Sequence, residues 1–183
     1  MQRLDDERYN SFAYTDSCLA VLLDSLKASP RWDNLLVIIV PDHGIPANAS
    51  QSTADPLVAR IPIVWTGGAI GQPCVIDCLM SQSDLVMTLL AQLLTLNPNM
   101  EHLISAPQRF PFSRNVLSPE YSSNYQFAMH AFKNGCNLFD SAGVARFDCP
   151  DRSVALLEGE LSPAKERFFR ALIQSAYYRS GSL

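Results

Sequence analysis

An apolar run in the first third of the chain ends abruptly in residues that could bind a metal ion. Leucine, isoleucine and valine fill Leu35–Val40, and Asp42-His43-Gly44 follows after Pro41. A carboxylate oxygen and an imidazole nitrogen from consecutive residues can reach one divalent cation if the backbone bends, and Gly44 permits a bend. Oxygen and nitrogen together suit zinc or manganese better than calcium, which prefers oxygen alone. Asp42 and His43 are therefore candidate metal ligands.

The same three residues have a plainer interpretation. A strand often leaves a sheet through an acid, a polar residue and a glycine merely to form a turn. Two ligands are also too few for a catalytic metal, because such sites usually take three or more protein groups. The metal hypothesis therefore depends on the elements around Asp42 and His43.

The elements before and after the motif are typical of an α/β fold. A helix is expected over residues 15–28, capped by Thr15 or Asp16, because four leucines recur there at helical spacing. The run 35–40 shows no alternation, which indicates a strand covered on both faces, as in a parallel sheet. In open α/β sheets ligands gather beyond the carboxyl ends of the strands, where Asp42 and His43 would lie.

A second strand and a second helix are expected further along. Residues 61–66 are apolar and stop at Gly67-Gly68, which we interpret as a turn because no Walker-type lysine follows. Ser81-Gln-Ser-Asp84 is typical of a capping box, and the leucines of 85–96 form a broad apolar stripe behind it. Asp84 is interpreted as a first-turn charge that complements the helix dipole.

The pattern of apolar and turn residues changes after residue 97. A long irregular connection leads to short aromatic-rich segments near 125–132, 136–139, 144–147 and 153–157, separated by turn residues typical of an antiparallel meander. A final helix is expected after Ser162 as its cap and Pro163 at its first position, with an apolar stripe of Phe168, Leu172 and Ile173. We therefore divide the chain into an α/β part, 1–105, and a small antiparallel β subdomain with a C-terminal helix, 106–183.

Composition excludes several classes of protein. The 183 residues are 48% apolar and 17% charged with a net charge of −4, which favours a globular body and offers no basic surface for nucleic acid. No apolar run approaches the ~20 residues that span a bilayer, and no signal peptide is visible at the start. The five cysteines have no paired zinc-site spacing, so free thiols are expected, with one disulfide left open for a chain outside the cytoplasm.

Other residues with chemical potential have structural interpretations. His102 and His130 stand alone and are expected to be structural histidines. Arg60 could face an anionic substrate, but a surface arginine is the simpler interpretation. Trp65 and Met87 fall on apolar faces and are expected in the core.

The ordered set of motifs resembles a known enzyme family. The segments "YNSFAYTDSCLAVLLDSLKASPRWDNLLVIIVPDHG", "RIPIVWTGGAI" and "SQSDLVMTLLAQLL" are similar to the C-terminal part of sulfatase-like enzymes of the alkaline phosphatase superfamily. Within that branch they look most like the lipoteichoic acid synthase group of phosphoglycerol transferases. The late "NGCNLFDSAGVARFDC" stretch is similar to the small antiparallel subdomain that follows in such enzymes. The resemblance implies a partial alkaline-phosphatase-like sheet with flanking helices.

The resemblance also implies a chemistry. Asp42 and His43 would be two ligands of a divalent metal, which would be manganese, magnesium or zinc, or calcium in a true sulfatase. The family's nucleophile lies far upstream of Asp-His-Gly, and only 41 residues precede Asp42 here. We therefore expect the chain to be the C-terminal part of a longer enzyme, to hold no catalytic nucleophile and to be inactive alone.

The expected substrate is a lipid- or glycan-linked phosphate or sulfate ester. The resemblance implies a membrane-anchored parent that holds this region outside the cytoplasm and transfers phosphoglycerol groups in the cell envelope, while this chain alone is expected to be soluble. Two alternatives stay open. One is an arylsulfatase-type sulfuric ester hydrolase, and the other is a non-catalytic remnant that self-associates and acts as a binding or assembly module.

Overall fold

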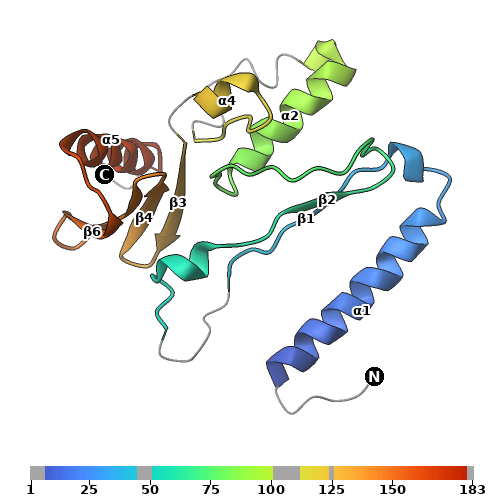
Figure 1. The fold of residues 1–183 in the computed structure, drawn as a ribbon, viewed down its shortest axis with the longest axis horizontal. Coiled ribbons are helices and arrows are strands. Elements are labelled where there is room, and N and C mark those ends of the chain that lie inside the picture. Colours follow the sequence, from blue (N-terminus) through green and yellow to red (C-terminus); the bar gives the residue numbers. More distant parts are fainter. Residues whose placement is uncertain (1–6, 45–50, 101–111, 124–125, 181–183) are drawn as a thin grey trace. The chain divides into compact units, whose positions relative to one another are not determined.

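The computed structural model describes residues 7–44, 51–100, 112–123 and 126–180 (Figure 1). The chain divides into two compact units. The first consists of Met1–His43 and Ile61–Val75, and the second of Gly44–Arg60 and Ile76–Leu183. The expected domain boundary between residues 105 and 106 lies outside the described residues and stays a prediction.

The first unit holds one long helix and a two-stranded sheet. Helix α1 spans Glu7–Lys27, and strands β1 (Val37–Ile39) and β2 (Val64–Thr66) run side by side in Figure 1. The two strands pair antiparallel, with Ile38 opposite Trp65. Gly67 follows β2 with a φ of +122°, and a Cβ there would lie 2.1 Å from the carbonyl oxygen of Leu35, so this turn requires glycine.

Two expectations for this unit are wrong in detail. The strand that precedes Asp42 is antiparallel to its neighbour, not parallel, because an unalternating apolar run reports only that both faces are covered and says nothing of strand direction. Thr15 and Asp16 are not caps, because α1 begins eight residues before Thr15 and both residues are exposed on its interior turns.

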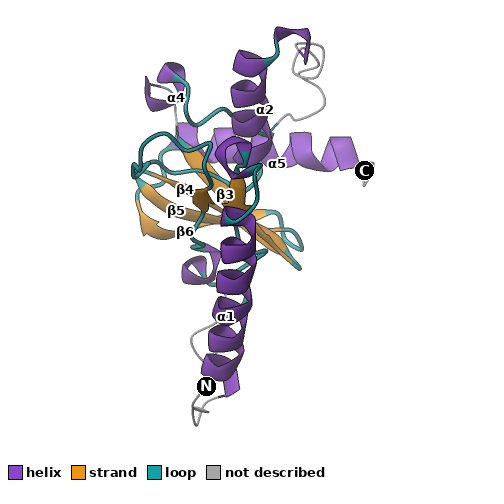
Figure 2. Ribbon diagram, turned by 90° about the vertical axis from the view of Figure 1, so that its right-hand side faces the viewer, coloured by secondary structure: helices purple, strands orange, loops and turns teal. Residues whose placement is uncertain are grey.

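The second unit contains a four-stranded antiparallel meander that packs against a helix. Strands β3 (Phe127–Phe132), β4 (Gly135–Asp140), β5 (Gly143–Asp148) and β6 (Ser153–Gly159) form an antiparallel sheet in chain order. Helix α5 (Pro163–Ser180) lies alongside this sheet (Figure 2). Helices α2 (Asp84–Leu96) and α4 (Pro119–Ser123) also belong to this unit. These elements confirm the expected α/β class, meander and final helix.

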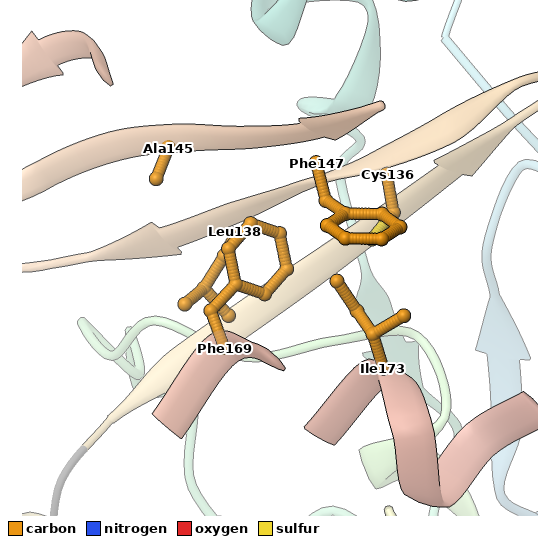
Figure 3. Close-up of a cluster of buried hydrophobic side chains, with 6 residues drawn as sticks. All are labelled: Cys136, Leu138, Ala145, Phe147, Phe169 and Ile173. Carbon is orange, nitrogen blue, oxygen red and sulfur yellow. The ribbon is translucent and has the colours of Figure 1, made fainter. Parts of the chain in front are cut away.

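One face of the meander carries the core. Leu138 and Ala145 are opposite each other on β4 and β5 and are fully buried, as is Phe169 of α5 (Figure 3). Helix α5 begins as expected, since the Lys165 amide donates to Ser162 Oγ at 3.1 Å. Its apolar stripe differs by one residue from the expectation, because Phe169 enters the core while Phe168 is partly exposed.

A buried carboxylate organises the other elements of the second unit. Asp84 is 0% exposed and accepts hydrogen bonds from the backbone amides of Ser81 and Arg114, both at 2.8 Å. The Arg114 guanidinium adds two more, from Nε at 3.0 Å and from Nη2 at 2.7 Å. Arg114 also donates to the Phe127 carbonyl oxygen and lies over the Phe127 ring, 3.9 Å from its centroid. Asp84 is thus a structural centre as well as a first-turn charge.

Replacing Asp84 by asparagine should destabilise the fold. The asparagine side chain has the shape of aspartate, but it lacks the negative charge that compensates Arg114. Its NH₂ group would also face N–H donors of Ser81 or Arg114 where a carboxylate oxygen now accepts from them. Breaking a buried pair in this way costs about 3–5 kcal/mol of unfolding free energy, with the lower figure expected because Arg114 is partly exposed. Urea unfolding followed by circular dichroism measures the change.

The matched control is Asp77→Asn, which alters an exposed aspartate of the same unit. Its unfolding free energy should change by no more than about 0.5 kcal/mol. Equal midpoints for the two variants would contradict the role given to Asp84.

Candidate functional site

Asp42 and His43 lie just beyond the end of β1, as the sequence predicts. Both side chains are exposed, at 88% for Asp42 and 70% for His43. The backbone amide of His43 donates to Asp42 Oδ1 at 2.9 Å, and the other carboxylate oxygen, Oδ2, lies 3.7 Å from His43 Nε2. The pair is therefore open to solvent, with one oxygen and one nitrogen turned toward each other.

This spacing fits two ligands of one metal ion. Bonds of about 2.1 Å to a nitrogen and to an oxygen place the two donors at most roughly 4.2 Å apart. The 3.7 Å between Nε2 and Oδ2 lies inside that limit. Within the described parts of the chain, no group of three or more histidine, cysteine, aspartate or glutamate side chains is arranged to hold a metal. The pair thus fits part of a metal site.

Gly44 is required here by space. A Cβ at this position would lie 2.1 Å from the carbonyl oxygen of Val58, so any other residue would collide with the backbone. Gly44 is not among the glycines with positive φ, so close approach explains it better than an unusual bend. Val58 is buried and belongs, like Gly44, to the second unit, so this close approach is a contact within that unit.

Val58 belongs to a short ordered segment between the two strands of the first sheet. The 3-10 helix Pro56–Ala59 is capped by Asp55, whose Oδ1 accepts the Leu57 amide at 2.8 Å. This hydrogen bond is the main cause that holds the pKa of Asp55 below its ordinary value. The segment is thus a defined turn and helix rather than a loose loop.

A polar cluster on the meander holds this segment. Asn137 Nδ2 donates to the Ala54 carbonyl oxygen at 2.8 Å, and Arg146 Nη2 donates to the same oxygen at 2.6 Å. Arg146 Nε also donates to Asn137 Oδ1 at 3.1 Å. His130 Nδ1 lies 3.5 Å from Asn137 Nδ2. We call Asn137, Arg146 and His130 the polar row.

Other residues singled out in the sequence occupy structural positions. Arg60 is exposed at the end of the 3-10 helix, and Trp65 and Met87 are half-buried. His102 lies outside the described residues. The five cysteines are all free: Cys18 and Cys74 are exposed, Cys78 and Cys149 half-buried and Cys136 buried.

A separate cavity of about 450 Å³ lies at the start of α5. Its lining includes Asp140 and Lys165, whose side chains are nearly fully buried and form an ion pair at 2.6 Å. These two opposite charges compensate each other, and Glu160 is the further acidic residue of the lining.

Comparison with known families identifies the first half of the chain. Residues 2–95 match the family model described as Sulfatase, and this range contains the Asp42-His43 pair. The chain belongs to the sulfatase family. A search of curated proteins gives no match.

A solved structure has a similar fold over nearly the whole chain. A protein in the alkaline phosphatase superfamily from Vibrio parahaemolyticus superposes with a TM-score of 0.65 at 21% identity. The alignment covers 99% of this chain and 44% of that chain, so this chain spans less than half the length of that relative. The fold is therefore alkaline-phosphatase-like, including the meander and α5.

Enzymes of this superfamily act on phosphate or sulfate esters and generally use divalent metals, which agrees with the expected class of activity. The assignment to the lipoteichoic acid synthase group stays a prediction. Among the described residues, no helix is both long enough and apolar enough to cross a bilayer.

Sequence reasoning missed Asn137 and Arg146. A signal was present, because His130, Asn137 and Arg146 are opposite one another across β3, β4 and β5 and alternate with core residues. Polar residues on the face away from a core normally meet water, so the pattern gave no reason to expect a contact. Only the fold reveals that the segment around Ala54 covers them.

The surroundings of His130 in the polar row predict how the free energy of unfolding depends on pH. Burial, and secondarily the positive charge of Arg146, lower the pKa of His130 from its ordinary 6.5. The unfolded chain therefore binds a proton at this histidine more readily than the folded chain. The free energy of unfolding should fall as pH decreases through about 6.5 and should level off below the folded-state pKa.

Urea unfolding from about pH 7.5 to about pH 5.5 tests this dependence, with His130→Gln as the control that cannot titrate. The unmodified chain should lose more stability than the control. An NMR titration midpoint of His130 above 6.5 would contradict the assignment.

Proposed function

We propose that this chain is the distal part of a metal-dependent enzyme that cleaves or transfers phosphate or sulfate esters. The observation that carries the proposal is the placement of Asp42 and His43 at the end of β1, inside the range that matches the sulfatase family. Phosphoglycerol-type transfer to a lipid or glycan of the cell envelope is the specific activity that we propose. It is supported by the sequence resemblance to phosphoglycerol transferases.

Each residue of the pair has a defined part in this proposal. Asp42 supplies a carboxylate oxygen and His43 a neutral imidazole nitrogen, and neither transfers a proton. The hydrogen bond from the His43 amide to Asp42 Oδ1 orients the carboxylate so that Oδ2 is turned toward His43 Nε2. A divalent cation held there would neutralise charge on the transferred group and lower the pKa of the nucleophile.

The remaining parts of the active site would come from a longer protein. This chain corresponds to 44% of the Vibrio parahaemolyticus protein, which leaves room in a parent of that size for a nucleophile and a third ligand. A membrane anchor and a location outside the cytoplasm are further parts of the proposal that rest on the resemblance to phosphoglycerol transferases.

Two observations favour other candidates. The matched family model is described as Sulfatase, which favours hydrolysis of sulfate esters. Large apolar side chains are exposed on α1, which favours a non-catalytic binding or assembly role through self-association. They are Tyr9, Phe12, Tyr14, Val21 and Leu22. Size-exclusion chromatography tests the binding or assembly role, because self-association predicts that the chain elutes as a dimer.

Manganese binding tests the metal site directly. Removing a ligand in Asp42→Ala or His43→Ala should weaken Mn²⁺ binding at least about tenfold, since loss of even an outer hydrogen-bond partner costs about 10–100-fold. Calorimetric titration measures the affinity in this chain and in the longer protein that contains it.

The control is Asp33→Ala, which removes an exposed acid of the same unit ahead of β1. Equal affinity in the Asp42→Ala, Asp33→Ala and unmodified proteins would refute the assignment. In the longer protein, turnover of a phosphodiester against a sulfate monoester distinguishes the two ester classes.

A further inference from the structure

The segment 51–60 is attached to the meander at the carbonyl oxygen of Ala54. Both parts belong to the second unit, which consists of Gly44–Arg60 and Ile76–Leu183. This oxygen accepts hydrogen bonds from Asn137 Nδ2 at 2.8 Å and from Arg146 Nη2 at 2.6 Å. The position of the segment on this face of the sheet therefore depends on the polar row.

The hydrogen bonds of the polar row fix the orientation of the Asn137 amide and the protonation state of His130. Asn137 Oδ1 accepts from Arg146 Nε at 3.1 Å, and Nδ2 donates to Ala54 O. Nδ2 also lies 3.5 Å from His130 Nδ1. Because an amide nitrogen only donates, His130 Nδ1 is the acceptor in this contact. The arrangement therefore requires a neutral imidazole with its proton on Nε2.

A second proton on His130 has no acceptor in this arrangement. Nδ1 would become a donor and would face the donor Nδ2 of Asn137. Turning the amide over would offer Oδ1 to His130, but it would set Nδ2 against Arg146 Nε and Oδ1 against the Ala54 carbonyl oxygen. Rotating the imidazole away would leave one N–H of Asn137 without a partner, and Asn137 is 0% exposed. Each response costs the polar row at least one hydrogen bond.

The charges around His130 act in the same direction. Burial, and after it the charge of Arg146, lowers the pKa of His130, whereas Lys133 in the turn after β3 and Asp148 at the end of β5 do not contribute. A backbone hydrogen bond and, less strongly, Arg146 lower the pKa of Asp55 in the segment below 3.8, so this carboxylate keeps its charge while His130 titrates. Protonation therefore places a second cation beside Arg146, one of the two groups that hold Ala54.

We propose that protonation of His130 loosens the attachment of the segment 51–60 to the meander, so that the polar row is a pH-sensitive contact. A neutral imidazole completes the hydrogen bonds of Asn137 and keeps the segment in place. An imidazolium removes one of these hydrogen bonds and repels Arg146. The inference concerns contacts within the second unit and does not depend on the proposed metal site.

Backbone amide exchange measured by NMR on the full chain tests this inference. The Leu57 amide donates to Asp55 Oδ1 at 2.8 Å and the Val58 amide to Asp55 O at 3.0 Å, so both report on the segment. The Cys149 amide donates to Asn134 O at 2.8 Å and reports on the meander. Each rate is divided into the intrinsic rate at the same pH to give a protection factor.

The pH is lowered from about 7.5 to about one unit below the midpoint of the His130 ring titration, measured on the same sample. Protection of Leu57 and Val58 should fall about tenfold relative to Cys149, because one hydrogen bond is lost and a repulsion is added. The midpoint of this fall should coincide with the midpoint of the ring.

Three results in the unmodified chain would overturn the proposal. One is unchanged protection of Leu57 and Val58 while His130 titrates. Another is an equal fall at Cys149, which would indicate general destabilisation. The third is an imidazole that stays neutral until the protein unfolds in acid.

His130→Gln is the matched variant, because its amide can accept from Asn137 but takes up no proton. Protection of Leu57 and Val58 relative to Cys149 should then be constant over the same pH range. A fall as large as in the unmodified chain would assign the effect to another group and would overturn the proposal.

Two further variants complete the experiment. Asn137→Leu removes both the His130 contact and the hydrogen bond to Ala54, so the relative protection of the segment should be low at every pH. The control is Arg170→Met, because Arg170 also donates to a backbone carbonyl, elsewhere in the second unit. This control should keep the pH dependence of the unmodified chain, and a segment equally protected at all pH values in Asn137→Leu would contradict the role of the polar row.

Discussion

The second unit depends on one buried carboxylate. Asp84 has no access to water and receives four hydrogen bonds, from the backbone of Ser81 and from the backbone and side chain of Arg114. A charge in this position is tolerated only because each of its lone pairs meets a donor and a guanidinium compensates it. Thr88, one helical turn along α2, extends the arrangement by donating to Arg114 O and accepting the Val116 amide.

This centre explains how elements distant in sequence form one body. Ser81 Oγ accepts the Met129 amide of β3, and Arg114 reaches the Phe127 carbonyl of the same strand. The start of α2, residues 113–116 and the edge strand of the meander are thereby joined through polar contacts. The apolar core between α5 and one face of the same sheet also contacts Phe127 and Met129 of this strand. Polar contacts fix the arrangement of these segments, and burial of apolar surface supplies most of the stability.

The sequence predicts local elements well and long-range polar contacts poorly. Period and turn residues were sufficient for the meander, for α2 and for the Ser162 cap of α5, because these depend on neighbouring residues. The direction of β1 was mistaken because its apolar run carries no information about its partner. Asn137 and Ala54 are 83 positions apart, and no local rule relates them.

At the candidate site, too, the sequence predicts the local features and not the long-range contacts. Asp42 and His43 were found because consecutive ligand-type residues after a strand are a local signal. The need for glycine at position 44 was anticipated, but its physical reason, the nearby carbonyl of Val58, depends on a contact 14 residues away. The depressed pKa of His130 likewise depends on burial and on Arg146 from another strand.

The path of the chain between the two units has a consequence for dissecting the protein. The backbone passes from one unit to the other after His43, after Arg60 and after Val75. Neither unit can therefore be obtained by cutting the chain once: a truncation after His43 removes β2, and one before Ile76 removes Gly44–Arg60 from the meander. A single proteolytic nick between residues 51 and 60 would leave both fragments holding parts of both units. Such a nicked protein is suited to complementation, in which two separately produced fragments must associate before the sheet of β1 and β2 is complete, while all four strands of the meander stay in one fragment.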